Sequence, residues 1–194
     1  MSRFVEDAVA RAGLMPLLDA RRAGDLDAVR ASMSSWRSAD LLVLGAIADL
    51  VRVAENGDEV RIHEDGGADV VWVEPRGTDL EMLREVAVSR IAAAKGARVG
   101  VDWTNRGLEI AQVALGFGAS DLRGPLTKKS GLPIYDDETK KVKDEGMTSV
   151  RELMQREIRL LVKYAGRAAV FVGESRKRAD VVRSVDSSTE VAGA

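Results

Sequence analysis

The hydrophobic pattern of the chain changes its period after residue 54, and this change constrains the fold more than any other feature. Up to Ala54, apolar residues recur every three to four positions, as they do in helices that bury one face. The stripe is clearest over Leu41–Val53. From Val60 onward, short runs of β-branched residues alternate with helical patterns. The sequence therefore predicts N-terminal helices followed by an α/β core.

Capping residues indicate where the first helices begin. Gly24 breaks one helix, and Asp25 can cap the next short one. Ser38 or Asp40 can cap Leu41–Val53, because both side chains accept hydrogen bonds from the free N–H groups of a first helical turn.

Further elements follow in alternation. Thr78 or Asp79 can cap a helix that reaches about Lys95, with Gly96 in the position of a C-cap glycine. The remaining predicted elements are a strand over Arg98–Trp103, a helix over Leu108–Phe117, a short strand within Asp121–Leu126, a helix from near Thr148 and a strand over Ala168–Val172.

Two short apolar runs surround a glycine-rich turn. They are Val60–His63 and Val70–Val73, and Asp65–Gly67 lies between them. Two runs joined in this way are typical of a β-hairpin.

The length suits one domain. At 194 residues and 20.9 kDa, with 45% hydrophobic residues, the chain can bury a single core. We expect a helical segment over residues 1–58, an α/β core of the same domain over 59–176 and a disordered tail over 177–194. Residues Thr127–Gly146 are polar and rich in helix breakers, which predicts a mobile excursion.

The charge balance and hydropathy limit the partners. Lys and Arg number 29 against 31 Asp and Glu, which gives a net charge of −2 and no electrostatic case for nucleic acid. No apolar signal core and no stretch of about 18 apolar residues is present. We expect a cytoplasmic protein with no membrane partner.

Residues that usually carry chemistry are scarce. The chain has no cysteine, and His63 is its single histidine, so we expect no metal and no cofactor. We expect His63 to be a solvent-facing strand residue; the alternative is a catalytic role. The acidic run Asp136–Glu138, with Asp144 and Glu145, indicates a solvated charge run, and the alternative is a divalent cation site.

Three segments, taken in order, resemble the radical S-adenosylmethionine enzymes of the futalosine menaquinone pathway and of deazaflavin synthesis. They are Ala39–Asp49 with Gly57-Asp58, then the helix-strand-helix-strand of Leu83–Gly124, then Met147–Val170. The resemblance implies a (β/α) barrel that holds an iron–sulfur cluster on three cysteines. This chain lacks those cysteines, and only Ile62–Thr78 stands where most barrel strands would lie. It therefore resembles a truncated, cysteine-free relative with a partial barrel-like sheet, whose open edge the hairpin could cover.

Ligands of barrels and open α/β sheets meet the carboxyl ends of strands. The expected ligand-binding residues belong to the end regions of the predicted strands Arg98–Trp103 and Asp121–Leu126. They are Trp103, Thr104, Asn105, Arg106, Asp121 and Arg123. Trp103 could stack on a flat ring, and the arginines could meet a carboxylate or phosphate. The alternative is that Trp103 fills the core and Asp121 caps a turn.

Two functional hypotheses follow. The first is a non-catalytic, radical-enzyme-derived binding or assembly protein linked to menaquinone biosynthesis, with a protein partner or a second copy of itself. The second is a small enzyme or small-molecule carrier that uses the strand-end pocket around Trp103 and Arg123.

Overall fold

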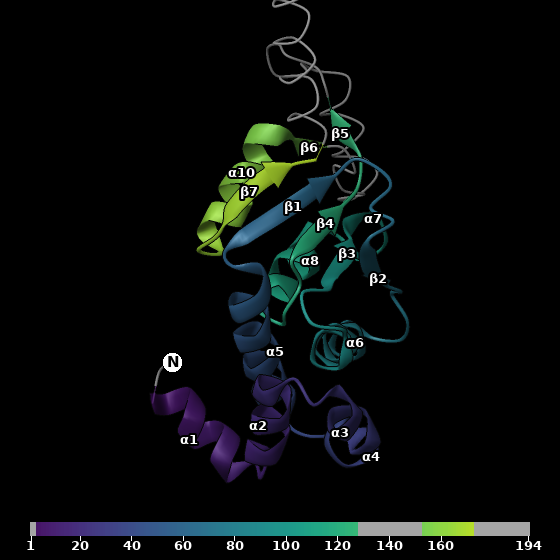
Figure 1. The fold of residues 1–194 in the computed structure, drawn as a ribbon. Coiled ribbons are helices and arrows are strands. Elements are labelled where there is room, and N and C mark those ends of the chain that lie inside the picture. Colours follow the sequence, from purple (N-terminus) through teal and green to yellow (C-terminus); the bar gives the residue numbers. More distant parts are fainter. Residues whose placement is uncertain (1–2, 128–152, 173–194) are drawn as a thin grey trace, which may run out of the picture.

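The computed structural model describes residues 3–127 and 153–172, which form an α/β fold (Figure 1). The helices are α1 (Arg3–Arg11), α2 (Met15–Ala23), α3 (Leu26–Ala31), α4 (Met33–Trp36), α5 (Leu41–Asn56), α6 (Asp79–Ala92), α7 (Trp103–Arg106), α8 (Leu108–Leu115) and α10 (Gln155–Tyr164). The strands are β1 (Glu59–His63), β2 (Val70–Val73), β3 (Arg98–Asp102), β4 (Asp121–Arg123), β5 (Leu126–Thr127), β6 (Leu153–Met154) and β7 (Ala168–Phe171).

The main sheet is open and parallel, in the order β2-β3-β4-β1-β7. Strand β1 lies between β4 and β7, and its Arg61 is opposite Asp121 on β4 and opposite Val170 on β7. A separate parallel pair joins β5 to β6. The expected α/β class, with an unclosed barrel-like sheet and N-terminal helices, is confirmed.

The predicted β-hairpin is wrong, because β1 and β2 run parallel and do not pair. Strands β4 and β3 lie between them, so the connection 64–69 must cross about 14 Å of sheet and also return to the starting end of β2. In Figure 1 this connection leaves the head of β1 and runs down beside the sheet to β2. Gly66 and Gly67 take positive φ of 75° and 76°, and left-handed glycines serve a crossing loop as well as a hairpin turn.

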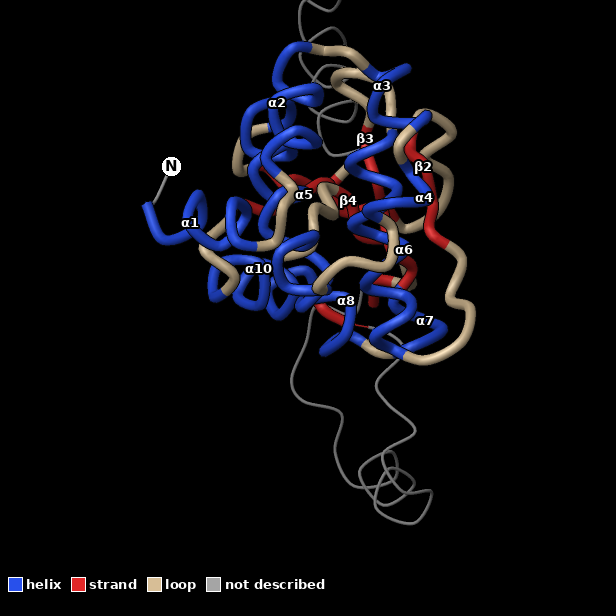
Figure 2. Tube along the Cα trace, turned by 90° about the horizontal axis from the view of Figure 1, so that it is seen from below, coloured by secondary structure: helices blue, strands red, loops and turns tan. Residues whose placement is uncertain are grey.

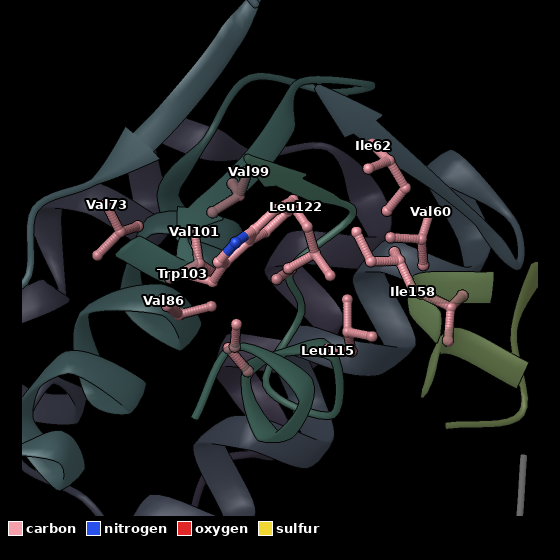
Figure 3. Packing of buried hydrophobic residues seen from close by; sticks show 14 of the residues in the cluster. Val60, Ile62, Val73, Val86, Val99, Val101, Trp103, Leu115, Leu122 and Ile158 are labelled. Atoms are coloured by element: carbon pink, nitrogen blue, oxygen red, sulfur yellow. The ribbon is translucent and has the colours of Figure 1, made fainter. Parts of the chain in front are cut away.

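One face of the sheet is apolar and packs on helices α6, α8 and α10. Figure 3 shows Val60, Val99 and Leu122 of the strands in one cluster with Leu115 of α8 and Ile158 of α10. Because side chains alternate along a strand, the strand residues next to these apolar ones point to the opposite face of the sheet. That face carries polar and charged side chains and is crossed by the loop 64–69.

The N-terminal helices form a second cluster against α5 and α6. Figure 2, seen from below, shows α2, α3 and α4 over this end of the molecule. The buried residues of this cluster include Leu14, Leu17 and Leu18, which the sequence places on one helical face. They also include Trp36, whose indole N–H donates to the carbonyl of Val29 at 3.0 Å. Helices α5 and α6 thus separate the N-terminal helices from the sheet.

Most predicted caps are confirmed. Asp25 accepts from the Ala28 N–H, Asp40 accepts from Leu42 and Val43, and Thr78 forms a capping box with Glu81.

Two predicted boundaries differ. Helix α6 ends at Ala92, so Gly96, with φ of 77°, serves the following turn instead of the C-cap. Leu153–Met154 pairs with β5 as a strand, and α10 begins only at Gln155. The predicted excursion beyond Thr127 and the predicted tail 177–194 lie outside the described residues.

No helix among the described residues is long and apolar enough to cross a membrane.

Candidate functional site

The carboxyl ends of β1, β3 and β4 meet at a hollow of about 360 Å³, which we call the strand-end hollow. Its lining comes from the loop after β1, the end of β3 with α7, and the end of β4. The lining residues are Glu64, Asp65, Gly66, Asp102, Thr104, Arg123, Gly124 and Pro125. This is the edge at which open α/β sheets bind ligands.

Arg123 is held from two sides. Its Nε donates to Asp102 Oδ2 at 3.0 Å, and its guanidinium carbon lies 4.3 Å from the centroid of the Trp72 ring. The Trp72 indole N–H in turn donates to the carbonyl of Gly67 at 3.0 Å, which fixes the ring under the crossing loop. The arginine therefore presents a pre-positioned cation.

Asp102 links this arginine to helix α7. Its Oδ1 accepts from the backbone N–H of Thr104 at 2.9 Å and from the Thr104 hydroxyl at 2.5 Å. Burial raises the pKa of Asp102, but the hydrogen bonds from Thr104 and Arg123 outweigh it and leave the pKa below its ordinary value. The carboxylate is therefore ionised at neutral pH.

The same three strands carry a buried cluster of polar side chains, centred on Asp121 of β4. Asp121 is fully buried, and it accepts hydrogen bonds from His63 Nε2 at 2.8 Å, Arg98 Nε at 2.7 Å and the Ser120 hydroxyl at 2.7 Å. Burial raises the pKa of Asp121, while these donors lower it, and the net direction is down.

Arg90 of α6 extends the cluster to the far end of β4. This fully buried side chain donates to Ser120 Oγ at 2.8 Å, to the Gly118 carbonyl at 2.8 Å and to Asn56 Oδ1 at 2.7 Å. Burial lowers the pKa of Arg90 to about 10. It stays charged at neutral pH and ties α5, α6 and β4 together.

Of the residues that the sequence singles out, Thr104 and Arg123 meet in the hollow. Asn105 is exposed on α7 but does not line it. Arg106 is held elsewhere, by Asp79 and the carbonyl of Gly77.

Trp103 and Asp121 take interior positions. Trp103 is buried in the core, in agreement with the alternative that it fills the core, and it packs so tightly that a Cβ at Gly124 would overlap its indole. Asp121 caps no turn; it is the centre of the buried cluster. Neither side chain lines the hollow.

The expectation that His63 faces solvent is wrong, because its side chain is only 2% exposed. The loop 64–69 covers it, and a Cβ at Gly67 would lie 3.2 Å from His63 Nδ1. Sequence reasoning also missed Trp72 and Asp102, although alternation places Asp102 on the same face as Arg98. Pairing of distant strands, which the local sequence does not encode, brings them together.

The charges of the hollow determine its chemistry. Glu64, Asp65 and Asp102 oppose the single cation Arg123, so a simple anion is disfavoured, whereas a ligand with an ammonium group or several hydroxyls would find acceptors. In the described part of the chain, no group of three or more His, Cys, Asp or Glu is arranged to hold a metal ion.

A scan against protein-family models finds no family that matches the chain, and a search of curated proteins finds no similar sequence.

Proposed function

We propose that this chain is a non-catalytic binding protein that holds a small zwitterionic or hydroxyl-rich molecule in the strand-end hollow. The observation that carries the proposal is the fixed Arg123, which lies between Asp102 and the Trp72 ring beside a hollow lined by further carboxylates. Arg123 would meet the carboxylate or a hydroxyl oxygen of the ligand, and Glu64 and Asp65 would meet its ammonium group.

The descent of the chain from radical S-adenosylmethionine enzymes is part of the same proposal. It is supported by the three segments that resemble those enzymes and by an open parallel sheet in place of a closed barrel. With no cysteine in the sequence, no thiolate is present to hold an iron–sulfur cluster. S-adenosylmethionine and aminofutalosine are therefore reasonable ligands to test for binding alone; the first carries an amino-acid group and both carry ribose hydroxyls.

The experiment is a thermal-shift titration with S-adenosylmethionine, aminofutalosine and naphthoate. A ligand that binds the folded state stabilises it by RT ln(1 + [L]/Kd), about 2.7 kcal/mol at a hundred times Kd. We expect a shift with at least one of the first two and a weaker one with naphthoate, which is purely anionic.

Matched arginine variants locate the binding. Arg123→Gln should abolish the shift, whereas Arg106→Gln, on α7 but outside the lining and bound to Asp79, should keep it. A shift that survives Arg123→Gln, or the absence of any shift, would contradict the proposal.

A second candidate function, assembly with a second copy of the chain, has its own observation. Among the described residues β2 and β7 are the edges of the sheet, and each carries an exposed valine: Val71 at 47% and Val170 at 37%. Exposed apolar edge strands pair readily with other strands. Light scattering should then give a dimer mass for the wild type and a monomer mass for Val170→Lys; a monomeric wild type would reject this function.

A further inference from the structure

A second hollow, of about 450 Å³, lies between the C-terminal end of α2 and the second half of α5, on the opposite side of the helical layer from the sheet. It is less open to solvent than the strand-end hollow. Its volume falls within the range typical of small-molecule sites. We call it the helical hollow.

The walls of this hollow differ in polarity. One part is apolar, formed by Leu18, Leu50, Val51 and Ala54. The other part carries cations, with Arg21, Arg22 and Lys95 against the single carboxylate of Glu55. The charge balance is thus the reverse of that in the strand-end hollow.

Arg21 is the unusual residue of the lining. Its side chain is 2% exposed, and its Nε and Nη2 have no hydrogen-bond acceptor among the described residues. Nη2 lies 2.6 Å from Glu55 Oε1, which gives an ion pair but not the alignment of a hydrogen bond. Glu55 is also engaged elsewhere, because its Oε2 accepts from the Gly96 N–H at 2.9 Å.

A buried donor without an acceptor raises the free energy of the folded state, and the cost is larger for a charged group such as a guanidinium than for a neutral one. An acceptor that enters the hollow beside Arg21 would complete the set, and the planar guanidinium matches a carboxylate in particular. The apolar wall would then cover the rest of the ligand.

We propose that the helical hollow binds a small amphiphilic carboxylate, whose charged group pairs with Arg21 and whose hydrocarbon part lies on the apolar wall of α2 and α5. This site is separate from the strand-end hollow and stands independently of the function proposed for it.

The probe is hexanoate, titrated into ¹⁵N-labelled protein and followed by NMR chemical shifts, with hexan-1-ol and hexylammonium as neutral and cationic counterparts of equal length. We expect saturable shifts for hexanoate that centre on α2 and α5, weaker binding of hexan-1-ol and none of hexylammonium. Equal binding of the alcohol and the carboxylate, or no saturable shift with hexanoate, would overturn the proposal.

Two variants test the two walls. Arg21→Gln should weaken hexanoate binding by about tenfold or more, the loss of one charge-assisted hydrogen bond. Ala54→Phe, at an exposed position of the rim, should block the hollow without disturbing the core. Val53→Phe, on the same helix but outside the lining, is the matched control and should bind as the wild type does.

Should Arg21→Gln fail to fold, Ala54→Phe decides alone. Unchanged hexanoate binding in Ala54→Phe would overturn the proposal.

Discussion

His63 and Asp121 lie on neighbouring strands and are joined side chain to side chain, with 2.8 Å between His63 Nε2 and Asp121 Oδ1 in the interior of the protein. The pair connects β1 to the middle strand β4, and Arg98 extends it to β3. Three of the five strands of the main sheet are therefore cross-linked through one carboxylate.

Replacing this carboxylate should lower stability strongly. In Asp121→Asn, Arg98 loses its charged partner while remaining buried, and breaking a buried pair in this way typically costs about 3–5 kcal/mol. Urea denaturation measures the loss. The exposed Asp19 on α2 is the matched control, and Asp19→Asn should stay within about 0.5 kcal/mol of the wild type. Equal effects of the two variants would show that the buried cluster contributes little.

Stability should fall in acid, with Asp121 and Asp102 as contributors. Both have a pKa below the ordinary aspartate value of about 3.9 in the folded state. Between the folded and unfolded pKa the unfolded chain binds more protons, so stability is complete above about pH 4 and is lost as the pH falls through the folded pKa. Urea midpoints measured from pH 7 to pH 2 should show this loss, with a shallower slope in Asp121→Asn. An unchanged slope in that variant would assign the effect to other carboxyls.

Gly100 should not tolerate a side chain. It lies opposite Trp72 in the register of β2 and β3, and a Cβ at this position would overlap the Trp72 ring and Val70. Gly100→Ala should lose about 1–3 kcal/mol of stability, as overpacked sites do. Adding Trp72→Leu should recover part of the loss. Gly116→Ala is the control and should be nearly neutral, because a Cβ at this position would lie 3.4 Å from its nearest neighbour, the carbonyl oxygen of Val113.

The order of the strands can be tested by disulfide formation, for which a cysteine-free chain is a clean background. Arg61 and Val170 are register partners on β1 and β7, so Arg61→Cys with Val170→Cys should form a disulfide on oxidation. Arg61→Cys with Val71→Cys should not, because two strands separate β1 from β2. Intact mass, which drops by two hydrogens when the bond forms, distinguishes them. A disulfide in the second pair alone would show that β1 and β2 are neighbours, as in the predicted β-hairpin.

The features that the sequence predicts correctly are local ones. Asp25, Asp40 and Thr78 cap the helices expected of them, because a cap depends on neighbours three residues away. The pairing of β1 is different: its partners follow β2 in the sequence, and the apolar run and the Gly-Gly turn suit a hairpin equally well. Alternation alone cannot say which strand lies alongside.

The candidate site divides in the same way. The expectation that the ends of neighbouring parallel strands lie together places Thr104 and Arg123 at one hollow, as the structure has them. Trp103 does not line the hollow, because Asp102 caps α7 and the chain turns there, so that the indole packs into the core. His63 is buried through Asp121, 58 residues away, and the ring of Trp72, together with the loop that crosses over it, and none of these contacts can be read from its local sequence.

The crossing connection between β1 and β2 has a consequence for how the chain acquires its structure. Strand β1 cannot pair with its neighbours as soon as it is synthesised, because the partner of His63 follows 58 residues later. Asp49 of α5, just before β1, likewise accepts a hydrogen bond from Arg167, 118 residues later. Contacts this distant in sequence slow folding, because the entropy of closing long loops is lost before the pairing compensates for it. During synthesis β1 therefore emerges well before either of its neighbours, and the sheet assembles around a strand that entered it early.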